Sequence, residues 1–296
     1  MERDKNKYRL SDKDHKDILQ NEIVPKLFSN DQQCSLSLPK VIVFAGQPGC
    51  GKTRAIEEAQ DELDQQGGAL LITSDDLRYY HPQYEWILMN DDVNSSFYTN
   101  PDADAWRQEV IAEAKERRLN FIVETTMRNS GETVQTLREL QNSGYYVDVR
   151  VLAVSMRLSS LGVLLRYERM KADRGVARMS IAEAQKAGYE GMPISVELIE
   201  QEKVANIVTV WRRSSELIYL NELLPSGEWI NEPAARVAIE VERRQPMSLQ
   251  VLKTYCNDCD KLYELITDPY RNATEEEISN IVRLREEAYN ELRLNY

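Results

Sequence analysis

Residues 46–53, GQPGCGKT, have the composition and spacing of a phosphate-binding loop. In the pattern GxxxxGK[ST], glycines let successive amides turn inward around a polyphosphate, the lysine reaches its β- and γ-phosphates, and the hydroxyl binds Mg²⁺. Lys52 and Thr53 take these two roles here, so the sequence predicts a site for ATP or GTP with Mg²⁺. The residues expected to contact the nucleotide are Gly46, Gln47, Pro48, Gly49, Cys50, Gly51, Lys52, Thr53 and Arg54.

Two aspartates, Asp75 and Asp76, follow the apolar run at 69–73. Beyond the carboxyl end of a strand next to the loop, a carboxylate can hold Mg²⁺ through water or accept the proton of an attacking hydroxyl. Aspartate is also common in turns and helix caps. The neighbouring phosphate loop favours a catalytic role, but residue types alone leave open which aspartate acts.

A second polar cluster, ETTMR at 124–128, follows the apolar residues 121–123. Glu124, Thr125 and Thr126 project from the same edge of the predicted sheet. A carboxylate with two hydroxyls suits recognition of a polyol or sugar by hydrogen bonds. A solvated strand end is the alternative interpretation.

Arginines gather in LLRYERMKADRGVARMS, at positions 166, 169, 174 and 178. Phosphoryl transfer requires cations over the transferring group, and the guanidinium fork matches its oxygens. A charged helix surface explains Arg169 and Arg174 well. We therefore expect Arg166 and Arg178 to act on the phosphates.

The elements that position these residues alternate between strands and helices from about residue 40 to 220. This order predicts an α/β fold of the P-loop NTPase type, with a mostly parallel sheet flanked by helices. Buried strands are expected at 41–45, 69–73, 120–124 and 146–154, and helices at 53–66, 104–118, 131–143, 157–174 and 192–213. A short strand pair is expected at 215–220 and 228–230.

Two flanks lie outside this alternation. Residues 11–29 carry apolar residues at helical spacing and predict one amphipathic helix. After residue 231 the strand signals stop, and three helices are expected at 234–244, 248–267 and 274–294. We therefore expect a kinase-like domain over 1–231 and a helical C-terminal appendage over 232–296.

Composition narrows the class of protein. The chain has 296 residues and a formal net charge of −12, which suits one principal domain and disfavours nucleic acid as a partner. The N-terminus lacks an apolar signal core and no stretch is long enough to span a bilayer, so we expect no membrane association and a cytoplasmic location. Cys256 and Cys259 are half of a zinc site at best and are predicted to be packing residues.

The motifs, in this order, resemble the zeta toxin family of bacterial kinases, the toxic partners in epsilon/zeta-type toxin–antitoxin systems. The resemblance runs from SDKDHKDILQ to about residue 222. It rests on GQPGCGKT, SDDLRYYHP, the ETT-x-R stretch, and AVSMRLSSLGVLLRYERM followed by ARMS. The last arrangement is much more specific than the phosphate loop alone.

The resemblance implies transfer of a phosphoryl group from ATP or GTP, with Mg²⁺, to the 3′-hydroxyl of the amino sugar in UDP-N-acetylglucosamine, which blocks cell-wall precursor synthesis. It implies that Asp75, and not Asp76, deprotonates the sugar. The remaining implied roles are the P-loop lysine for Lys52, the Mg²⁺ hydroxyl for Thr53, sugar-nucleotide binding for Glu124 and Thr126 with Arg128 nearby, and transition-state contacts for Arg166 and Arg178.

The chain departs from the family pattern after the second arginine, where Gln185–Lys186 replaces a usual His–Asp pair. The resemblance also implies an antitoxin, because in many such systems a separate three-helix protein blocks the nucleotide site. That antitoxin acts in trans, or residues 232–296 take its place in cis. A helical buttress that only packs on the sheet is the alternative for this segment.

Two other functions fit the residues. One is an antibiotic or small-alcohol phosphotransferase with the same base and a different pocket around Glu124. The other is a P-loop NTPase switch that acts on a protein partner, although no water-positioning glutamine signature is evident. The sequence does not distinguish ATP from GTP or define the oligomeric state.

Overall fold

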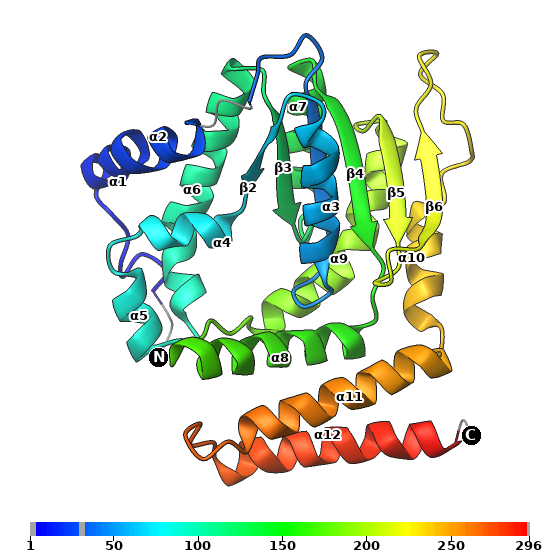
Figure 1. Cartoon of the computed structure of the whole chain (residues 1–296). Coiled ribbons are helices and arrows are strands. Elements are labelled where there is room, and N and C mark those ends of the chain that lie inside the picture. The colour runs from blue at the N-terminus through cyan, green and yellow to red at the C-terminus, as the bar shows by residue number, and fades with distance from the viewer. Residues whose placement is uncertain (1–3, 30–32, 295–296) are drawn as a thin grey trace.

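The computed structural model describes residues 4–29 and 33–294. Its centre is a six-stranded sheet in the order β2-β3-β1-β4-β5-β6 (Figure 1). The strands are β1 (Lys40–Ala45), β2 (Ala69–Ile72), β3 (Asn120–Thr125), β4 (Tyr146–Leu152), β5 (Ile207–Trp211) and β6 (Leu217–Glu222). All neighbours pair in parallel except β5 and β6. The predicted α/β class with a mostly parallel sheet is confirmed.

Helices cover both faces of the sheet (Figure 1). They are α3 (Lys52–Asp64), α4 (Ser74–Leu77), α5 (Tyr84–Asn90), α6 (Ser95–Glu116), α7 (Ser130–Asn142), α8 (Met156–Arg174), α9 (Ala182–Gln201), α10 (Ala235–Arg244), α11 (Leu249–Ile266) and α12 (Glu275–Leu294), with a 3₁₀ turn at Arg78–Tyr80. On one face, α3 packs on Ile42 and Phe44 of β1. On the other, residues of α6, α7, α9 and α10 share one apolar cluster with Val41 and Val43. Burial on both faces explains the continuous apolar run of β1.

The region around residue 200 differs from the prediction. The pattern predicts a helix over 192–213, but α9 ends at Gln201 and Ile207–Trp211 form β5. Lys203, with a φ of 53°, turns the chain after the helix. The next residues are rich in valine and isoleucine, whose branched side chains favour a strand. The part of the predicted helix beyond Gln201 was therefore wrong.

The predicted strand pair that follows is only partly correct. β6 pairs with β5 rather than with 228–230. The second segment contributes a single bridge, between Leu223 and Trp229.

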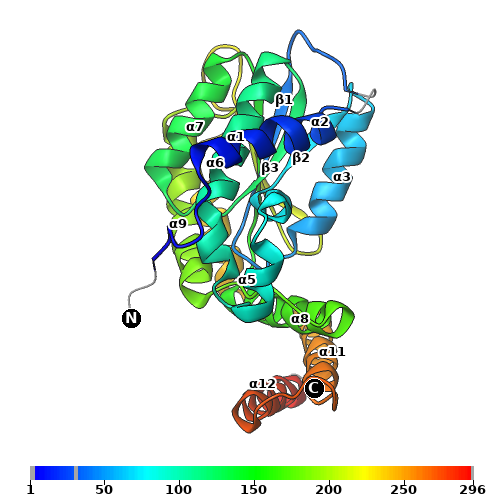
Figure 2. The ribbon, with the colours of Figure 1, turned by 90° about the vertical axis from the view of Figure 1, so that its left-hand side faces the viewer.

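The N-terminal helix is present but not uniform. α1 (Asp12–Ile18) continues through a π-helical turn (Leu19–Ile23) into α2 (Val24–Leu27). Pro25 has no N–H to donate within the helix, which fits a widened turn just before it. The helix crosses α6 (Figure 2), where the His15 ring stacks on Trp106 with 5.0 Å between centroids.

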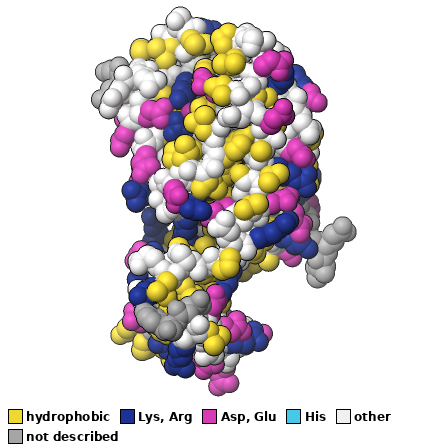
Figure 3. Space-filling view, turned by 90° about the vertical axis from the view of Figure 1, so that its right-hand side faces the viewer, with side chains coloured by type: hydrophobic (Ala, Val, Ile, Leu, Met, Phe, Trp, Pro, Cys, Tyr) yellow, Lys and Arg dark blue, Asp and Glu magenta, His cyan; other side chains and the backbone are white. Residues whose placement is uncertain are grey.

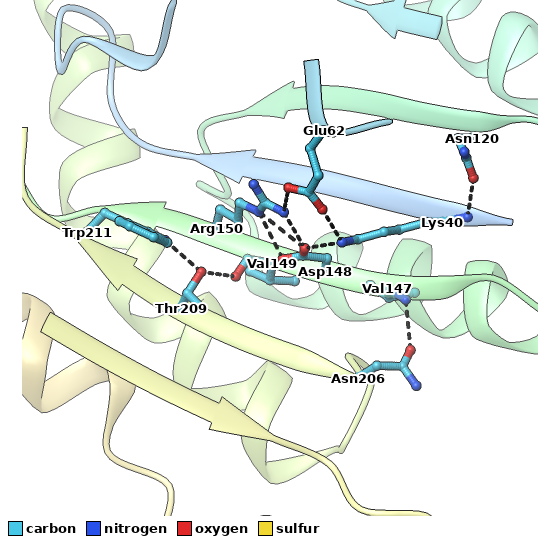
Figure 4. A network of polar contacts seen from close by, with 10 residues as sticks. All are labelled: Lys40, Glu62, Asn120, Val147, Asp148, Val149, Arg150, Asn206, Thr209 and Trp211. Atoms are coloured by element: carbon cyan, nitrogen blue, oxygen red, sulfur yellow. Dashed lines mark hydrogen bonds and ion pairs between the residues drawn. The ribbon is translucent and has the colours of Figure 1, made fainter. Parts of the chain in front are cut away.

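An ion-pair network ties the end of α3 that is far from the phosphate loop to the sheet (Figure 4). Lys40 of β1 lies 2.8 Å from Glu62 of α3 and 3.0 Å from Asp148 of β4. Arg150 contacts the same two carboxylates at 2.7 and 2.8 Å. Two cations thus balance two carboxylates, and the network holds α3 so that its N-terminus lies at the carboxyl end of β1.

The three predicted C-terminal helices are found, and they pack in two different ways. Ala235 and Ile239 of α10 belong to the main core. α11 and α12 form a hairpin that buries a separate apolar cluster against Leu161 and Leu165 of α8. The hairpin lies below the body of the molecule (Figures 1 and 3). Among the helices of residues 4–29 and 33–294, none is long and apolar enough to cross a membrane.

Candidate active site

The phosphate loop joins β1 to α3 and packs tightly against α8. Gly49 and Gly51 have φ of 79° and 93°, a conformation that favours glycine. Gly162 of α8 also requires a small residue, because a Cβ there would lie 2.3 Å from the carbonyl oxygen of Gly49. α8 thus forms a wall directly beside the loop.

Lys52 is buried at the start of α3, and its ammonium group points back into the loop. Nζ donates to the carbonyl oxygens of Gly46 at 2.6 Å and Gln47 at 3.3 Å, and lies 3.2 Å from Oε1 of Glu124. Burial opposes the charge, but nearby Cys50 and Glu124 outweigh it and raise the pKa of Lys52. The ammonium group of Lys52 is therefore a cation in a fixed position. A bound phosphate could replace Glu124 as its ion-pair partner.

The remaining predicted loop contacts differ in their surroundings. Thr53 is exposed on the first turn of α3. Arg54 is exposed and forms an ion pair with Glu58 at 2.9 Å, one turn along the helix. The described residues contain no cluster of three or more His, Cys, Asp or Glu side chains that could hold a metal ion. A P-loop Mg²⁺ does not require such a cluster, since one hydroxyl and phosphate oxygens bind it.

The structure separates the roles of the two aspartates. Asp76 takes part in the cap of its own helix with the N-cap residue Thr73, since its carboxylate accepts from the Thr73 hydroxyl at 2.7 Å and its N–H donates back to that hydroxyl. Asp75 faces the arginines: Arg178 forms a short ion pair with it, and Nε of Arg78 lies 3.3 Å away. Residue types alone left this choice open, whereas the family resemblance favoured Asp75.

Three guanidinium groups set the charge state of Asp75. Desolvation opposes ionisation of the carboxylate, but the charges of Arg178, Arg78 and Arg166 outweigh it and hold the pKa of Asp75 below its usual value. The side chain remains 50% exposed. Asp75 is thus an ionised, reachable carboxylate in a cationic environment.

Arg166 and Arg178 come from different segments and meet near Asp75. Arg166, on α8, donates to the Ser180 hydroxyl at 2.6 Å. Arg178, in the segment between α8 and α9, donates to the Ser96 hydroxyl at 3.1 Å. Burial and the charge of Arg178 lower the pKa of Arg166. Two like charges held near each other favour the binding of an anion beside them.

Glu124, Thr126 and Arg128 lie at and after the end of β3. Glu124 contacts Lys52, as described above, and so faces the loop. Thr126 and Arg128 pack closely against α9. A Cβ added to Gly188 would lie 3.0 Å from Thr126, and one added to Gly191 would lie 2.4 Å from the carbonyl oxygen of Arg128. The two glycines of α9 therefore fix where this loop lies.

Sequence reasoning missed several residues of the site. Arg78 is buried, donates to Thr99 at 3.2 Å and holds Asp75. Its position three residues after Asp75, on a helical turn, was a usable signal. Gln185, recognised only as a departure from a family pattern, is buried and donates to the Pro48 carbonyl at 3.4 Å. It therefore supports the loop directly.

A hollow of about 340 Å³ opens beside the loop. Arg166 and Arg169 of α8, Arg213 of the β5–β6 connection and Asp258 of α11 are among its lining residues. Arg213 lies against the loop, since a Cβ on Gly51 would be 3.4 Å from its Nε. With Asp173 also in the lining, three arginines face two aspartates, and the size of the hollow suits part of a nucleotide.

Comparisons with known proteins identify the family of the chain. The sequence profile of the family described as Zeta toxin matches residues 27–223. Toxin zeta of Enterococcus hirae is 25% identical over 189 residues, which cover 64% of this chain and 65% of that protein. Toxin PezT of Streptococcus pneumoniae is 26% identical over 204 residues, with 64% of this chain and 79% of PezT covered. The chain thus spans just under two thirds of the length of toxin zeta.

Solved structures share the fold. A chain from the PezAT chromosomal toxin–antitoxin system of Streptococcus pneumoniae superposes with a TM-score of 0.74 at 21% identity, covering 88% of this chain and 100% of that chain. A chain of the AvrRxo1-ORF1:AvrRxo1-ORF2 complex with ATP gives a TM-score of 0.52 at 13% identity, over 93% and 84% of the two chains. At these identities the similarity concerns the fold alone.

Proposed function

Because the chain belongs to the zeta toxin family, we propose that it is a kinase toxin of a toxin–antitoxin system. The proposed reaction transfers the γ-phosphoryl group of ATP or GTP to the 3′-hydroxyl of the amino sugar in UDP-N-acetylglucosamine, which blocks synthesis of cell-wall precursors. The observation that carries the proposal is the convergence of Asp75, Arg166 and Arg178 next to the Lys52–Glu124 pair.

In the proposed reaction each residue has one task. Lys52 grips the β- and γ-phosphates, and Arg166 and Arg178 neutralise the charge on the transferring group. Asp75 accepts the proton of the sugar hydroxyl. Arg178 has several N–H donors, so it can hold Asp75 and a phosphate oxygen together and align the base with the reacting group.

Mg²⁺, when bound, would offset the negative charge of the phosphates. Thr53 is the residue that would hold it, because its hydroxyl directly follows Lys52 at the start of α3. Glu124, Thr126 and Arg128 are proposed to bind the sugar nucleotide, since they extend the same edge of the sheet.

The α11–α12 hairpin is proposed to restrict access to the nucleotide in cis, in place of a separate antitoxin. It packs on α8, which carries Arg166 and Arg169, and Asp258 of α11 lines the hollow beside the loop. A carboxylate there opposes the entry of an anionic nucleotide. Removing the hairpin therefore raises activity in this proposal.

The reaction is tested by incubating the protein with labelled ATP and UDP-N-acetylglucosamine. Asp75→Asn is expected to lower the rate of transfer by about 10²–10⁴-fold, the usual contribution of a general base. Asp76→Asn is the matched control, because it changes an adjacent aspartate that only caps a helix. Release of inorganic phosphate alone, with no phosphorylated sugar, would favour an NTPase switch instead. Labelling of other alcohols only would favour a different phosphotransferase.

The role of the hairpin is tested with a chain that ends at Pro246. This cut removes α11 and α12 but keeps α10. We expect a rise in kcat/KM for ATP of about tenfold or more, because the binding-competent fraction increases. Asp258→Asn in the full chain is expected to give a smaller rise in the same direction. An unchanged kcat/KM in both would show that the hairpin is a buttress.

A further inference from the structure

Arg243, on the last turn of α10, reaches the phosphate loop from outside the segment that matches the family. Its side chain is buried, with 7% exposed. Nη2 donates to Oε1 of Gln47 at 3.0 Å, and Nη1 donates to the Tyr189 carbonyl at 2.6 Å. The guanidinium also lies 4.0 Å from the centre of the Tyr189 ring. A residue remote in sequence thus holds the second residue of the loop.

The contact fixes the orientation of Gln47. The amide nitrogen of Gln47 donates to the Val154 carbonyl at 2.7 Å and to the Ser159 hydroxyl at 3.2 Å, which leaves its oxygen for Arg243. The backbone carbonyl of the same residue accepts from Lys52. Arg243, Gln47 and Lys52 therefore form a continuous chain of contacts into the phosphate site.

The charge on Arg243 lacks a direct carboxylate partner among the contacts found for it. Both of its hydrogen bonds go to neutral oxygens, and its buried Nε has no hydrogen-bond partner within the described residues. Burial lowers the pKa of Arg243 to about 10, so the group stays protonated at neutral pH. Buried charges are usually paired, since an unpaired one is costly to desolvate.

We propose that Arg243 is a positioning residue of the phosphate loop, whose buried charge is balanced by the polyphosphate of the bound nucleotide. The inference rests on the proposed nucleotide binding and adds to it that α10 belongs to the binding machinery. The charge acts from behind the loop, and the fork holds Gln47 in place while the phosphates bind.

The test measures the Kd of MgATP and MgGTP by calorimetry, and the Tm without nucleotide, for full-length variants. Arg243→Met keeps much of the apolar stem and is expected to weaken binding by about tenfold, the scale of a lost charged hydrogen bond. Its Tm without nucleotide is expected to change little, because an unpaired buried charge is also removed. A merely structural role predicts the reverse, a lower Tm with the wild-type Kd.

Arg244→Met is the matched control. Arg244 is the next residue on α10, its side chain is 78% exposed, and it contacts only Glu240 among the ion pairs found. The hairpin is present in both variants, so any occlusion cancels in the ratio of their Kd values. If Arg243→Met does not fold, Arg243→Lys is measured in its place. A roughly two- to tenfold weaker nucleotide affinity, estimated from the loss of the guanidinium fork, supports the inference. An unchanged nucleotide affinity overturns it. Equal affinities of all folded variants overturn this inference alone. A chain that binds neither nucleotide, both at full length and when it ends at Pro246, overturns the proposed function as well.

Discussion

α10 and the α11–α12 hairpin follow one another in the chain, yet they relate to the rest of the molecule differently. The buried carboxylate of Glu200 accepts the Ala235 N–H at the start of α10, and Arg243 at its end reaches the loop. Between them, Ile239 is fully buried in the main core. α10 is therefore fixed at both ends and along its inner face.

The hairpin instead has an apolar cluster of its own and meets the body mainly through α8. The buried Glu168 of α8 accepts from Arg271 at 2.6 and 3.0 Å, and Arg157 forms a short ion pair with Glu291. The contrast teaches that helical composition beyond residue 231 does not define one unit. One helix packs into the main core, and two helices pack in a separate cluster on α8.

Figure 3 shows the side of the molecule where β6 and α10 lie, with hydrophobic side chains exposed on its surface. α10 keeps an exposed apolar face, with Val237 at 61% and Val241 at 51%. Two apolar residues of β6, Leu217 and Leu220, are also exposed. The inner face of α10, and not its overall hydrophobicity, is what joins it to the core.

The largest expected effect comes from placing a charge at matched buried positions of the two regions. Ile239→Asp in α10 should destabilise the whole protein by about 3–5 kcal/mol, because an unpaired charge enters the main core. Leu262→Asp in α11 introduces the same charge at an equally buried site. It should detach only the hairpin and leave the main calorimetric transition in place. Equal losses of the main Tm would contradict the division.

Removing the ion pair beneath the hairpin gives the next effect. Arg271→Ala leaves Glu168 buried without its cation, which costs about 3 kcal/mol. Hydrogen exchange should then show faster opening of α11 and α12, with α10 amides as protected as before. Arg283→Ala is a suitable control, since that arginine contacts only Asn280 of its own helix among the hydrogen bonds found. Faster exchange throughout the protein would argue against an independent hairpin.

Acidification should open the hairpin before the core. The Thr274 N–H and the Arg271 charge hold the pKa of Glu277 below its usual value, and contacts with Tyr289 and Arg285 outweigh desolvation and do the same for Asp260. A lowered folded-state pKa adds stability above the unfolded-state pKa, and this is lost as pH falls through the folded-state value. Protection factors in α12, which correct for the intrinsic exchange rate at each pH, should therefore fall as the pH drops below about 4, the usual carboxyl pKa, and at a higher pH than those in β1.

The smallest effect is a difference in thiol reactivity that leaves stability unchanged. Cys256 and Cys259 are buried between the hairpin and α8, and burial raises the pKa of Cys259 to about 12. Alkylation of both should be at least about a hundredfold slower than that of exposed Cys34. The Arg271→Ala variant should narrow this gap, because the hairpin opens. Rapid labelling of Cys259 in the wild type would show that the hairpin is not closed in solution.

Much of the fold was accessible to sequence reasoning, because local signals and the global fold agree over most of the chain. The phosphate loop, five of the six strands and the three C-terminal helices were all predicted. β5 was missed, since a short apolar run fits either period and only its place between β4 and β6 settles it. Arg243 was missed for another reason, because its partners, Gln47 and Tyr189, come from distant elements.

By itself the sequence determined the phosphate loop, the carboxylates at the strand ends and the pattern of helices and strands, because each depends on residue types at fixed short spacings. Only the tertiary structure decided that Asp75 faces the arginines while Asp76 caps a helix. It also decided that α10 belongs to the core while α11 and α12 stand apart. These outcomes depend on which side chains, distant in the sequence, meet in space. Contacts of this kind occur at no fixed sequence spacing, so no local pattern predicts them.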